Sequence, residues 1–134
     1  LSHPEFYKAG VAGAPVTDWR DYDAAYSERF MGLLPEAKAA YDSQSLLTMA
    51  ASPTPSRPLL VIHGTADDNV YFANTLKLVD GLTRANKPFE VLPLLGQTHL
   101  VADPGLSEIV SQRSAEFLRS ALSGEATTTY PHYL

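Results

Sequence analysis

The chain has 134 residues, of which 45% are hydrophobic, and a formal net charge of −5. These values fit one modest domain with a hydrophobic core, and the negative charge argues against a nucleic-acid partner, which normally faces a basic surface. Because there is no cysteine, a disulfide framework and a thiolate zinc site are excluded, and no apolar run approaches the roughly 20 residues that span a bilayer.

The chain does not begin with Met, and its first residues are polar and include Pro4. This is not the pattern of a signal peptide. We expect a piece of a longer protein, in which any targeting signal would lie in the missing part.

The first half of the chain predicts one strand followed by short helices. Residues 6–14 are rich in small side chains, which allow close backbone approach, and predict a strand that Pro15 ends. Asp21 is placed to cap a helix over 22–30. Three aromatic residues of that helix share one face at spacings of four: Tyr22, Tyr26 and Phe30.

Pro35 suits the first turn of a second helix over 36–41. Residues 43–58 are rich in Ser, Thr and Pro and predict a connection, with a turn of helix near 46–50. Residues 59–62, Leu-Leu-Val-Ile, have no polar alternation, which predicts a fully buried strand of a parallel sheet.

The second half repeats the alternation of helix and strand. A helix is predicted over 71–85, a strand over 89–95, and a last helix that begins at Asp103-Pro104 and ends near residue 122, before Gly124. The residues expected to face the core are Phe72, Leu76, Val79 and Leu82 on the first helix and Leu106, Val110, Phe117 and Ala121 on the second.

The succession of strand, helices, strand, helix, strand and helix predicts an α/β fold of parallel strands with flanking helices. We find no internal boundary in residues 1–124 and expect residues 125–134 to form a loose tail.

Two acids and a histidine follow the two later strands. Asp67 and Asp68 come just after residues 59–62, and His99 follows the strand over 89–95. Acid before histidine, each past a strand end, matches the second half of the Ser, Asp, His order of α/β-hydrolases. From the residues alone, a turn or helix-capping role for the acids stays open, as does a surface role for His99.

The other histidines have simpler interpretations. His63 is expected to support the acid-bearing loop, and His3 and His132, near the ends, are expected to be exposed. A metal site formed by His63, Asp67 and His99 is a further alternative, because imidazole and carboxylate groups are good zinc ligands.

Residues 63–70, His-Gly-Thr-Ala-Asp-Asp-Asn-Val, resemble the acid-bearing motif of the prolyl oligopeptidase family of serine peptidases, in its dipeptidyl peptidase IV branch. Residues 14–19, Ala-Pro-Val-Thr-Asp-Trp, and 22–32, Tyr-Asp-Ala-Ala-Tyr-Ser-Glu-Arg-Phe-Met-Gly, are similar to a segment that precedes this motif in that branch. The resemblance covers about residues 6–122 and implies the C-terminal part of an α/β-hydrolase domain.

The resemblance implies roles for individual residues. Asp67 corresponds to the triad acid and His99 to the base, although the usual glycine after that histidine is Leu100 here. Asp68 would hold the loop, and Asn69 would bind a backbone carbonyl of the substrate. The wall of a pocket for a Pro or Ala side chain would comprise Val16, Trp19, Tyr22, Tyr26 and Val70.

The implied enzyme removes dipeptides from peptides with Pro or Ala second from the N-terminus, without metal or cofactor. No Gly-x-Ser-x-Gly motif is present. The resemblance implies that the nucleophile elbow lies just upstream of the first strand, about a dozen residues before Leu1, so the isolated chain is expected to be inactive. The remainder of the catalytic domain and a β-propeller would complete the protein. A homodimer stays open, and the family favours a periplasmic or extracellular location.

Two kinds of alternative remain. One is a related hydrolase of the same fold with another specificity, namely an acylaminoacyl peptidase, a tripeptidyl peptidase or a carboxylesterase. The other is a non-catalytic homologue that serves as a binding module.

Overall fold

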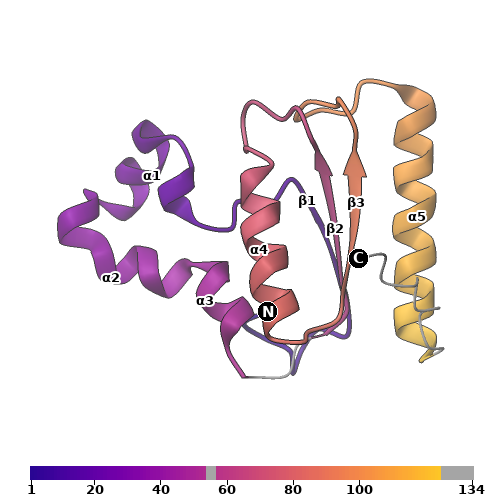
Figure 1. Ribbon diagram of the computed structural model, residues 1–134, viewed down its shortest axis with the longest axis horizontal. Helices are drawn as coiled ribbons and strands as arrows, with labels where there is room; N and C mark the ends of the chain where they lie inside the picture. The colour runs from indigo at the N-terminus through magenta and orange to yellow at the C-terminus, as the bar shows by residue number, and fades with distance from the viewer. Residues whose placement is uncertain (54–56, 125–134) are drawn as a thin grey trace.

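Three parallel strands in the order β1-β2-β3 form the centre of the computed structural model (Figure 1), which describes residues 1–53 and 57–124. The strands are β1 (Gly10–Gly13), β2 (Leu59–Gly64) and β3 (Phe89–Leu94). The central strand, β2, pairs in parallel with both neighbours, so that Val61 lies between Ala12 and Val91. The predicted parallel α/β arrangement is confirmed.

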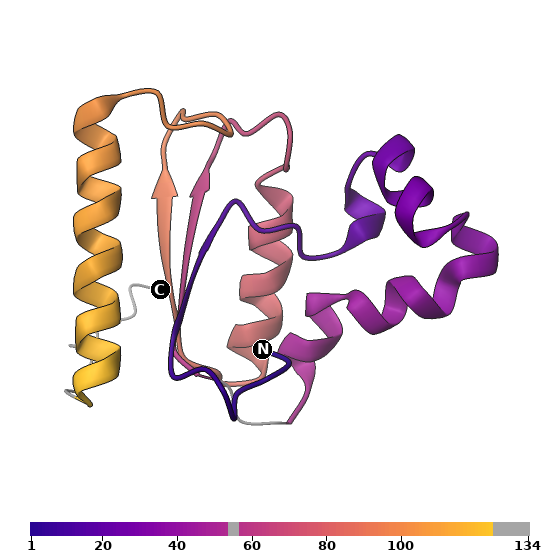
Figure 2. The same cartoon turned by 180° about the vertical axis from the view of Figure 1, so that it is seen from behind.

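Helices cover both faces of the sheet, with α3 and α4 on one side and α5 on the other (Figures 1 and 2). The shorter helices α1 and α2 extend outward beyond α4. The helical elements are η1 (Trp19–Asp21), α1 (Ala24–Met31), α2 (Leu34–Gln44), α3 (Leu46–Ala51), α4 (Ala73–Arg84) and α5 (Pro104–Ser123).

Two hydrophobic clusters pack on opposite faces of β2, because successive side chains of a strand point to opposite sides. Val61 packs with α3 and α4, whereas Leu60 and Ile62 pack toward α5. The first cluster comprises Ala50, Val61, Leu78 and Leu82, and the second Leu60, Ile62, Leu94 and Phe117. The prediction of a fully buried central strand is therefore confirmed from Leu60 onward.

The first strand is shorter than predicted, because β2 offers no partner before residue 59. Gly10 is the first residue of β1 and pairs with Leu59. Earlier residues turn instead, with Phe6 N donating to His3 O, and the rings of Phe6 and Tyr7 are exposed. Within the described residues, β1 pairs with β2 alone, so its other edge carries no strand.

The predicted cap of the first helix is wrong by a few residues. Asp21 is the last residue of η1, and its carboxylate pairs with Lys77 Nζ at 2.6 Å. Two other aspartates cap instead: Asp18 accepts from Arg20 N and Asp23 from Ala25 N. The break between η1 and α1 explains the error, because each short helix begins with its own aspartate.

The later helices lie close to their predicted positions. Helices were expected over 36–41, 46–50 and 71–85, and α2, α3 and α4 occupy these places. In α5, Asp103 Oδ1 accepts from Leu106 N at 2.9 Å, and Gly124 follows the helix with a φ of 74°. Both predicted ends of α5 are thus confirmed.

The inward face of α4 differs from the prediction. Leu76 is 57% exposed, whereas Asn74 and Thr75 are buried beside Leu78 and Leu82. The prediction from apolar spacing is wrong here because two polar side chains, Asn74 and Thr75, have buried hydrogen-bond partners.

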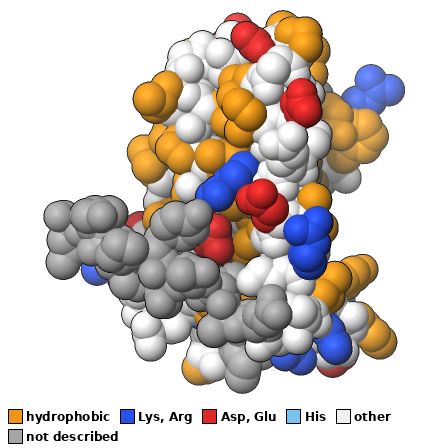
Figure 3. Space-filling model, turned by 90° about the vertical axis from the view of Figure 1, so that its right-hand side faces the viewer, with side chains coloured by type: hydrophobic (Ala, Val, Ile, Leu, Met, Phe, Trp, Pro, Cys, Tyr) orange, Lys and Arg blue, Asp and Glu red, His pale blue; other side chains and the backbone are white. Residues whose placement is uncertain are grey.

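The side of the molecule that carries α5 exposes both hydrophobic and charged side chains, and neither sign of charge dominates the view in Figure 3. None of the helices in the described part of the chain is long and apolar enough to cross a membrane. The predicted tail over 125–134, His132 and residues 54–56 of the predicted connection lie outside the described residues.

Candidate active site

The loop that follows β2 gives its two adjacent acids different surroundings. Asp67 is 5% exposed, whereas Asp68 is exposed. Asp67 Oδ1 accepts hydrogen bonds from the backbone N–H groups of Asn69 and Val70, each at 2.9 Å. Aspartate suits this turn because its short side chain reaches the backbone two residues on. Only Asp67 therefore points into the protein.

The loop that follows β3 lies directly against the end of β2. A Cβ atom on Gly64 would stand 2.3 Å from the carbonyl oxygen of Gln97, so only glycine fits at this position. Ala66 N donates to Gln97 O at 3.0 Å, and Gly96 N donates to Thr65 Oγ1 at 2.9 Å. These contacts bring the two loops together at the carboxyl edge of the sheet, where open α/β sheets hold their ligands.

His99 meets Asp67 at this edge. Its Nδ1 lies 2.9 Å from Asp67 Oδ2, and the imidazole is 36% exposed while the carboxylate is fully covered. A covered carboxylate on Nδ1 holds an imidazole in one tautomer and stabilises its protonated form. The two residues predicted as acid and base are therefore brought together; their roles stay a prediction.

His63 lies beneath the same loop, in the support position that the sequence predicted. It is 1% exposed; Nδ1 is 2.7 Å from Thr75 Oγ1 and Nε2 is 2.7 Å from Val70 O. Because the Val70 carbonyl can only accept, Nε2 carries the proton of a neutral His63 and Nδ1 accepts from the Thr75 hydroxyl. The ring thus ties α4 to the end of the acid loop.

Hydrogen bonds keep Asp67 ionised although it is buried. Burial raises the pKa of a carboxyl group, but the bond from His99 and the backbone bonds from Asn69 and Val70 outweigh it. The pKa of Asp67 therefore lies below the ordinary value of 3.8. A permanently charged acid is available to the imidazole at neutral pH.

The sequence also left open a metal site formed by His63, Asp67 and His99. Across residues 1–53 and 57–124, no group of three or more His, Cys, Asp or Glu side chains is arranged to hold a metal ion. The ring nitrogens of His63 are used by Val70 and Thr75.

Three aromatic side chains, Trp19, Tyr22 and Tyr26, form a cluster that we call the aromatic wall. Trp19 and Tyr26 are stacked with centroids 5.9 Å apart, and Tyr22 meets both rings edge-on. Tyr26 is 49% exposed, so the wall is not ordinary core packing of α1. Such rings present flat apolar surface.

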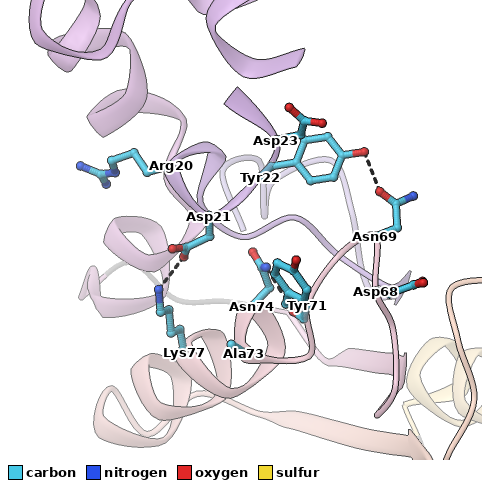
Figure 4. Close-up of a pocket in the computed structure, with 10 residues that line it drawn as sticks. All are labelled: Arg20, Asp21, Tyr22, Asp23, Asp68, Asn69, Tyr71, Ala73, Asn74 and Lys77. Atoms are coloured by element: carbon cyan, nitrogen blue, oxygen red, sulfur yellow. Dashed lines mark hydrogen bonds and ion pairs between the residues drawn. The ribbon is translucent and has the colours of Figure 1, made fainter. Parts of the chain in front are cut away.

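The aromatic wall reaches the acid loop through Tyr22, whose hydroxyl donates to Asn69 Oδ1 at 2.9 Å (Figure 4). Of the remaining predicted pocket residues, Val70 is buried at the end of the acid loop, and Val16 is half-buried between β1 and η1. The wall and the acid loop therefore share one region of the molecule.

A cavity of about 560 Å³ opens beside this contact (Figure 4). Tyr22 and Asn69 line it, together with charged side chains that include Arg20, Asp21 and Lys77. The other predicted substrate residues do not line this cavity.

A set of buried polar residues, which the sequence did not predict, lies near the wall. Thr17, Asp18 and Ser45 are each less than 5% exposed, as are Asn74 and Thr75. Ser45 Oγ donates to Asp18 Oδ2 at 2.9 Å, and Thr17 N donates to Asn74 Oδ1 at 3.0 Å. The sequence feature that could have indicated them is the pair of adjacent polar residues, Asn74 and Thr75, in the first turn of α4, where an inward apolar residue was expected.

Comparison with known proteins gives a consistent result. A family model described as the prolyl oligopeptidase family matches residues 1–125. Two curated relatives named "Probable dipeptidyl-aminopeptidase B" are each 39% identical: one from Metarhizium robertsii over 120 residues and one from Aspergillus clavatus over 126 residues. The matches cover 89% and 93% of this chain.

The structure is also similar to the crystal structure of dipeptidyl peptidase 4 from Porphyromonas gingivalis. The TM-score is 0.82 at 36% sequence identity, over 87% of this chain and 16% of that one. The chain spans 13% and 14% of the length of the two fungal relatives. It therefore matches a small part of much larger proteins.

Proposed function

The chain belongs to the prolyl oligopeptidase family, and on that premise we propose that it supplies the acid and the base of a serine peptidase that releases N-terminal dipeptides after Pro or Ala. Asp67 would be the acid and His99 the base of a Ser-Asp-His triad. The observation that carries the proposal is the 2.9 Å contact between His99 Nδ1 and the fully covered carboxylate of Asp67.

The proposed chemistry uses the other nitrogen of the imidazole. Because Nδ1–H of His99 donates a hydrogen bond to the Asp67 carboxylate, Nε2 of the neutral imidazole is the proton acceptor. A serine hydroxyl from outside this chain would lose its proton to Nε2 as it attacks the peptide carbonyl, and the same proton would pass to the leaving amine. Asp67 stabilises the imidazolium between these steps.

The substrate would lie between the aromatic wall and the acid loop. A proline ring is flat and apolar, so aromatic faces accept it without desolvating polar groups. Val16 and Val70 would complete the wall, and the Asn69 side chain would donate to a substrate carbonyl. The Tyr22 hydroxyl, by donating to Asn69 Oδ1, leaves the amide N–H₂ group for that task.

The remainder of the catalytic domain, with the serine, and a β-propeller are proposed parts of the whole protein. The small share of its relatives that the chain covers supports this. The edge of β1 that carries no strand in the described residues is a suitable place for the rest of the sheet to attach.

The test is a pair of variants in the full-length protein, Asp67→Asn and Asp68→Asn, assayed on Ala-Pro and Gly-Pro p-nitroanilides. Asn at the triad acid favours the wrong imidazole tautomer, and kcat is expected to fall by about 10⁴-fold. The exposed Asp68 is the matched control, and its variant should stay within about twofold.

Full activity of Asp67→Asn would contradict the proposed triad. A wild-type protein that cleaves a simple ester but neither anilide would point to a carboxylesterase. A residue other than serine at the upstream nucleophile position would favour a binding module.

A further inference from the structure

A buried polar contact joins the segment before η1 to the first turn of α4. Thr17 and Asn74 lie 57 positions apart in sequence, and each is 1% exposed. Thr17 N donates to Asn74 Oδ1 at 3.0 Å, and the Thr17 hydroxyl donates to the Asn74 backbone oxygen at 3.0 Å. We call this pair the Thr17–Asn74 joint.

Both residues are held from their other sides as well. Asn74 Nδ2 donates to Tyr71 O at 3.2 Å, and Leu46 N donates to Thr17 O at 2.9 Å. These bonds restrain both residues, which are each 1% exposed, and Asn74 also lies at the lining of the cavity beside Tyr22 and Lys77. Directional bonds of this kind fix the relative register of two backbones, which apolar contacts do not.

The two segments that the joint connects carry the two sides of the proposed pocket. Thr17 stands between Val16 and the aromatic wall, two residues before Trp19. Asn74 comes soon after Asn69 and Val70, which are the proposed carbonyl-binding and wall residues of the acid loop. Asn74 and Tyr71 lie below the contact between Tyr22 and Asn69 in Figure 4.

Two further contacts near the joint lie at the surface. The Tyr22–Asn69 hydrogen bond and the Asp21–Lys77 ion pair are both exposed, and solvent competes for them. The Thr17–Asn74 joint is buried, and breaking it would leave buried polar groups without partners, which is costly.

We propose that Thr17 and Asn74 are positioning residues that set the distance between the aromatic wall and the acid loop, and with it the fit of the Pro or Ala side chain. The inference rests on the proposed dipeptidyl peptidase function. Neither residue is assigned contact with the substrate or with the triad, so their effect passes through the pocket alone.

The test uses Thr17→Val in the full-length protein, because valine keeps the shape of threonine and removes only the hydroxyl bonds. Activity is measured on Ala-Pro and Ala-Ala p-nitroanilides. The rate of inactivation by diisopropyl fluorophosphate is measured beside it. This reagent reacts with the triad serine but is too small to need the pocket. Thr17→Ser restores the hydroxyl, and Thr83→Val, at an exposed position of α4, is the matched control.

Thr17→Val is expected to lower kcat/KM on Ala-Pro by about tenfold, mainly through KM, since small displacements of positioning groups have effects of this size. The preference for Ala-Pro over Ala-Ala should shrink, and the inactivation rate should stay unchanged. Thr17→Ser and Thr83→Val should behave like the wild type. If Thr17→Val does not fold, Thr17→Ala is used in its place, because alanine puts no methyl group where the hydroxyl was. The same changes in KM and selectivity are expected of it.

The possible failures can be told apart. A Thr17 variant with wild-type KM and selectivity overturns the positioning role while the proposed function stands. A parallel fall in anilide hydrolysis and in the rate constant of organophosphate inactivation also overturns it, because that pattern places the defect in the triad and not in the pocket. A wild-type protein without activity on either anilide overturns the proposed function and this inference with it.

Discussion

At the scale of single residues, burial separates two aspartates that are adjacent in sequence. Asp67 is covered and surrounded by donors, whereas Asp68 faces solvent. The partners of Asp67 are His99 on one carboxylate oxygen and the backbone N–H groups of Asn69 and Val70 on the other. His63 Nε2 adds a further contact at 3.2 Å. The donors explain why a buried acid has a lowered pKa.

Tyr22 gives a prediction at this scale. Tyr22→Phe keeps the ring in the aromatic wall but removes the hydroxyl that orients Asn69. The Asn69 amide is then free to turn, and KM on Ala-Pro p-nitroanilide is expected to rise about three- to tenfold, the effect of one net hydrogen bond. Steady-state kinetics of the full-length protein measure it.

Tyr7→Phe, at a ring that is 68% exposed, is the matched control and should leave kcat and KM unchanged. A fall in kcat at constant KM for Tyr22→Phe would contradict an orienting role and would point to the chemical step.

At the scale of elements, α4 shows how tertiary contacts change the face that a helix buries. The apolar spacing selected Leu76 and Leu82 alike, but they are 57% and 1% exposed. Asn74 and Thr75 take inward positions because Thr17 and His63 supply their hydrogen-bond partners. The helix is rotated accordingly, and its buried leucines are Leu78 and Leu82.

This rotation predicts unequal effects of the same substitution. Leu82→Ala should lower the free energy of unfolding by about 2–5 kcal/mol, because it opens a cavity against Val61 and Ala50. Leu76→Ala should change it by less than about 0.5 kcal/mol. Urea denaturation of the purified variants measures both, and equal losses would show that Leu76 is buried in solution.

At the scale of the whole molecule, polar contacts hold η1, α2 and the start of α3 together. Asp18 is central to this attachment. Its carboxylate accepts from Arg20 Nε at 2.7 Å and from Ser45 Oγ at 2.9 Å, and Arg20 also pairs with Asp42 on α2. One aspartate thus links η1 to α2 and to the start of α3.

The attachment should depend on pH. The hydrogen bonds from Arg20 lower the pKa of Asp18 to about 2, and burial opposes this only in part. A lowered pKa means that the stabilisation is complete above the ordinary value of 3.8 and is lost as pH falls toward 2. Asp18→Asn should therefore cost at most about 2 kcal/mol at neutral pH, and nothing near pH 2.

Calorimetric melting of wild type and Asp18→Asn across the acid range tests the prediction. The two melting temperatures should converge as pH falls. Asp80→Asn, at an exposed pair with Arg84 on α4, is the control and should show little difference at any pH. A constant gap between Asp18→Asn and wild type would contradict the linkage.

The sequence by itself determined the order and type of the main elements, because apolar runs, prolines and capping residues are local signals. It also determined the family, through the motif over 63–70 and the segment over 14–32. The resemblance had singled out Asp67 and His99, but only the tertiary structure shows that Asp67 is the buried acid and that His99 reaches it. The contact between Thr17 and Asn74 was not predicted at all. These contacts join residues that lie 32 and 57 positions apart in the sequence. The spacing of polar residues along the chain does not indicate which distant residue will become their buried partner. For the same reason the burial of Leu76 and the capping role of Asp21 were predicted wrongly. The spacing of residues along one element indicates which of them share a face, but burial depends on which other elements pack against that face.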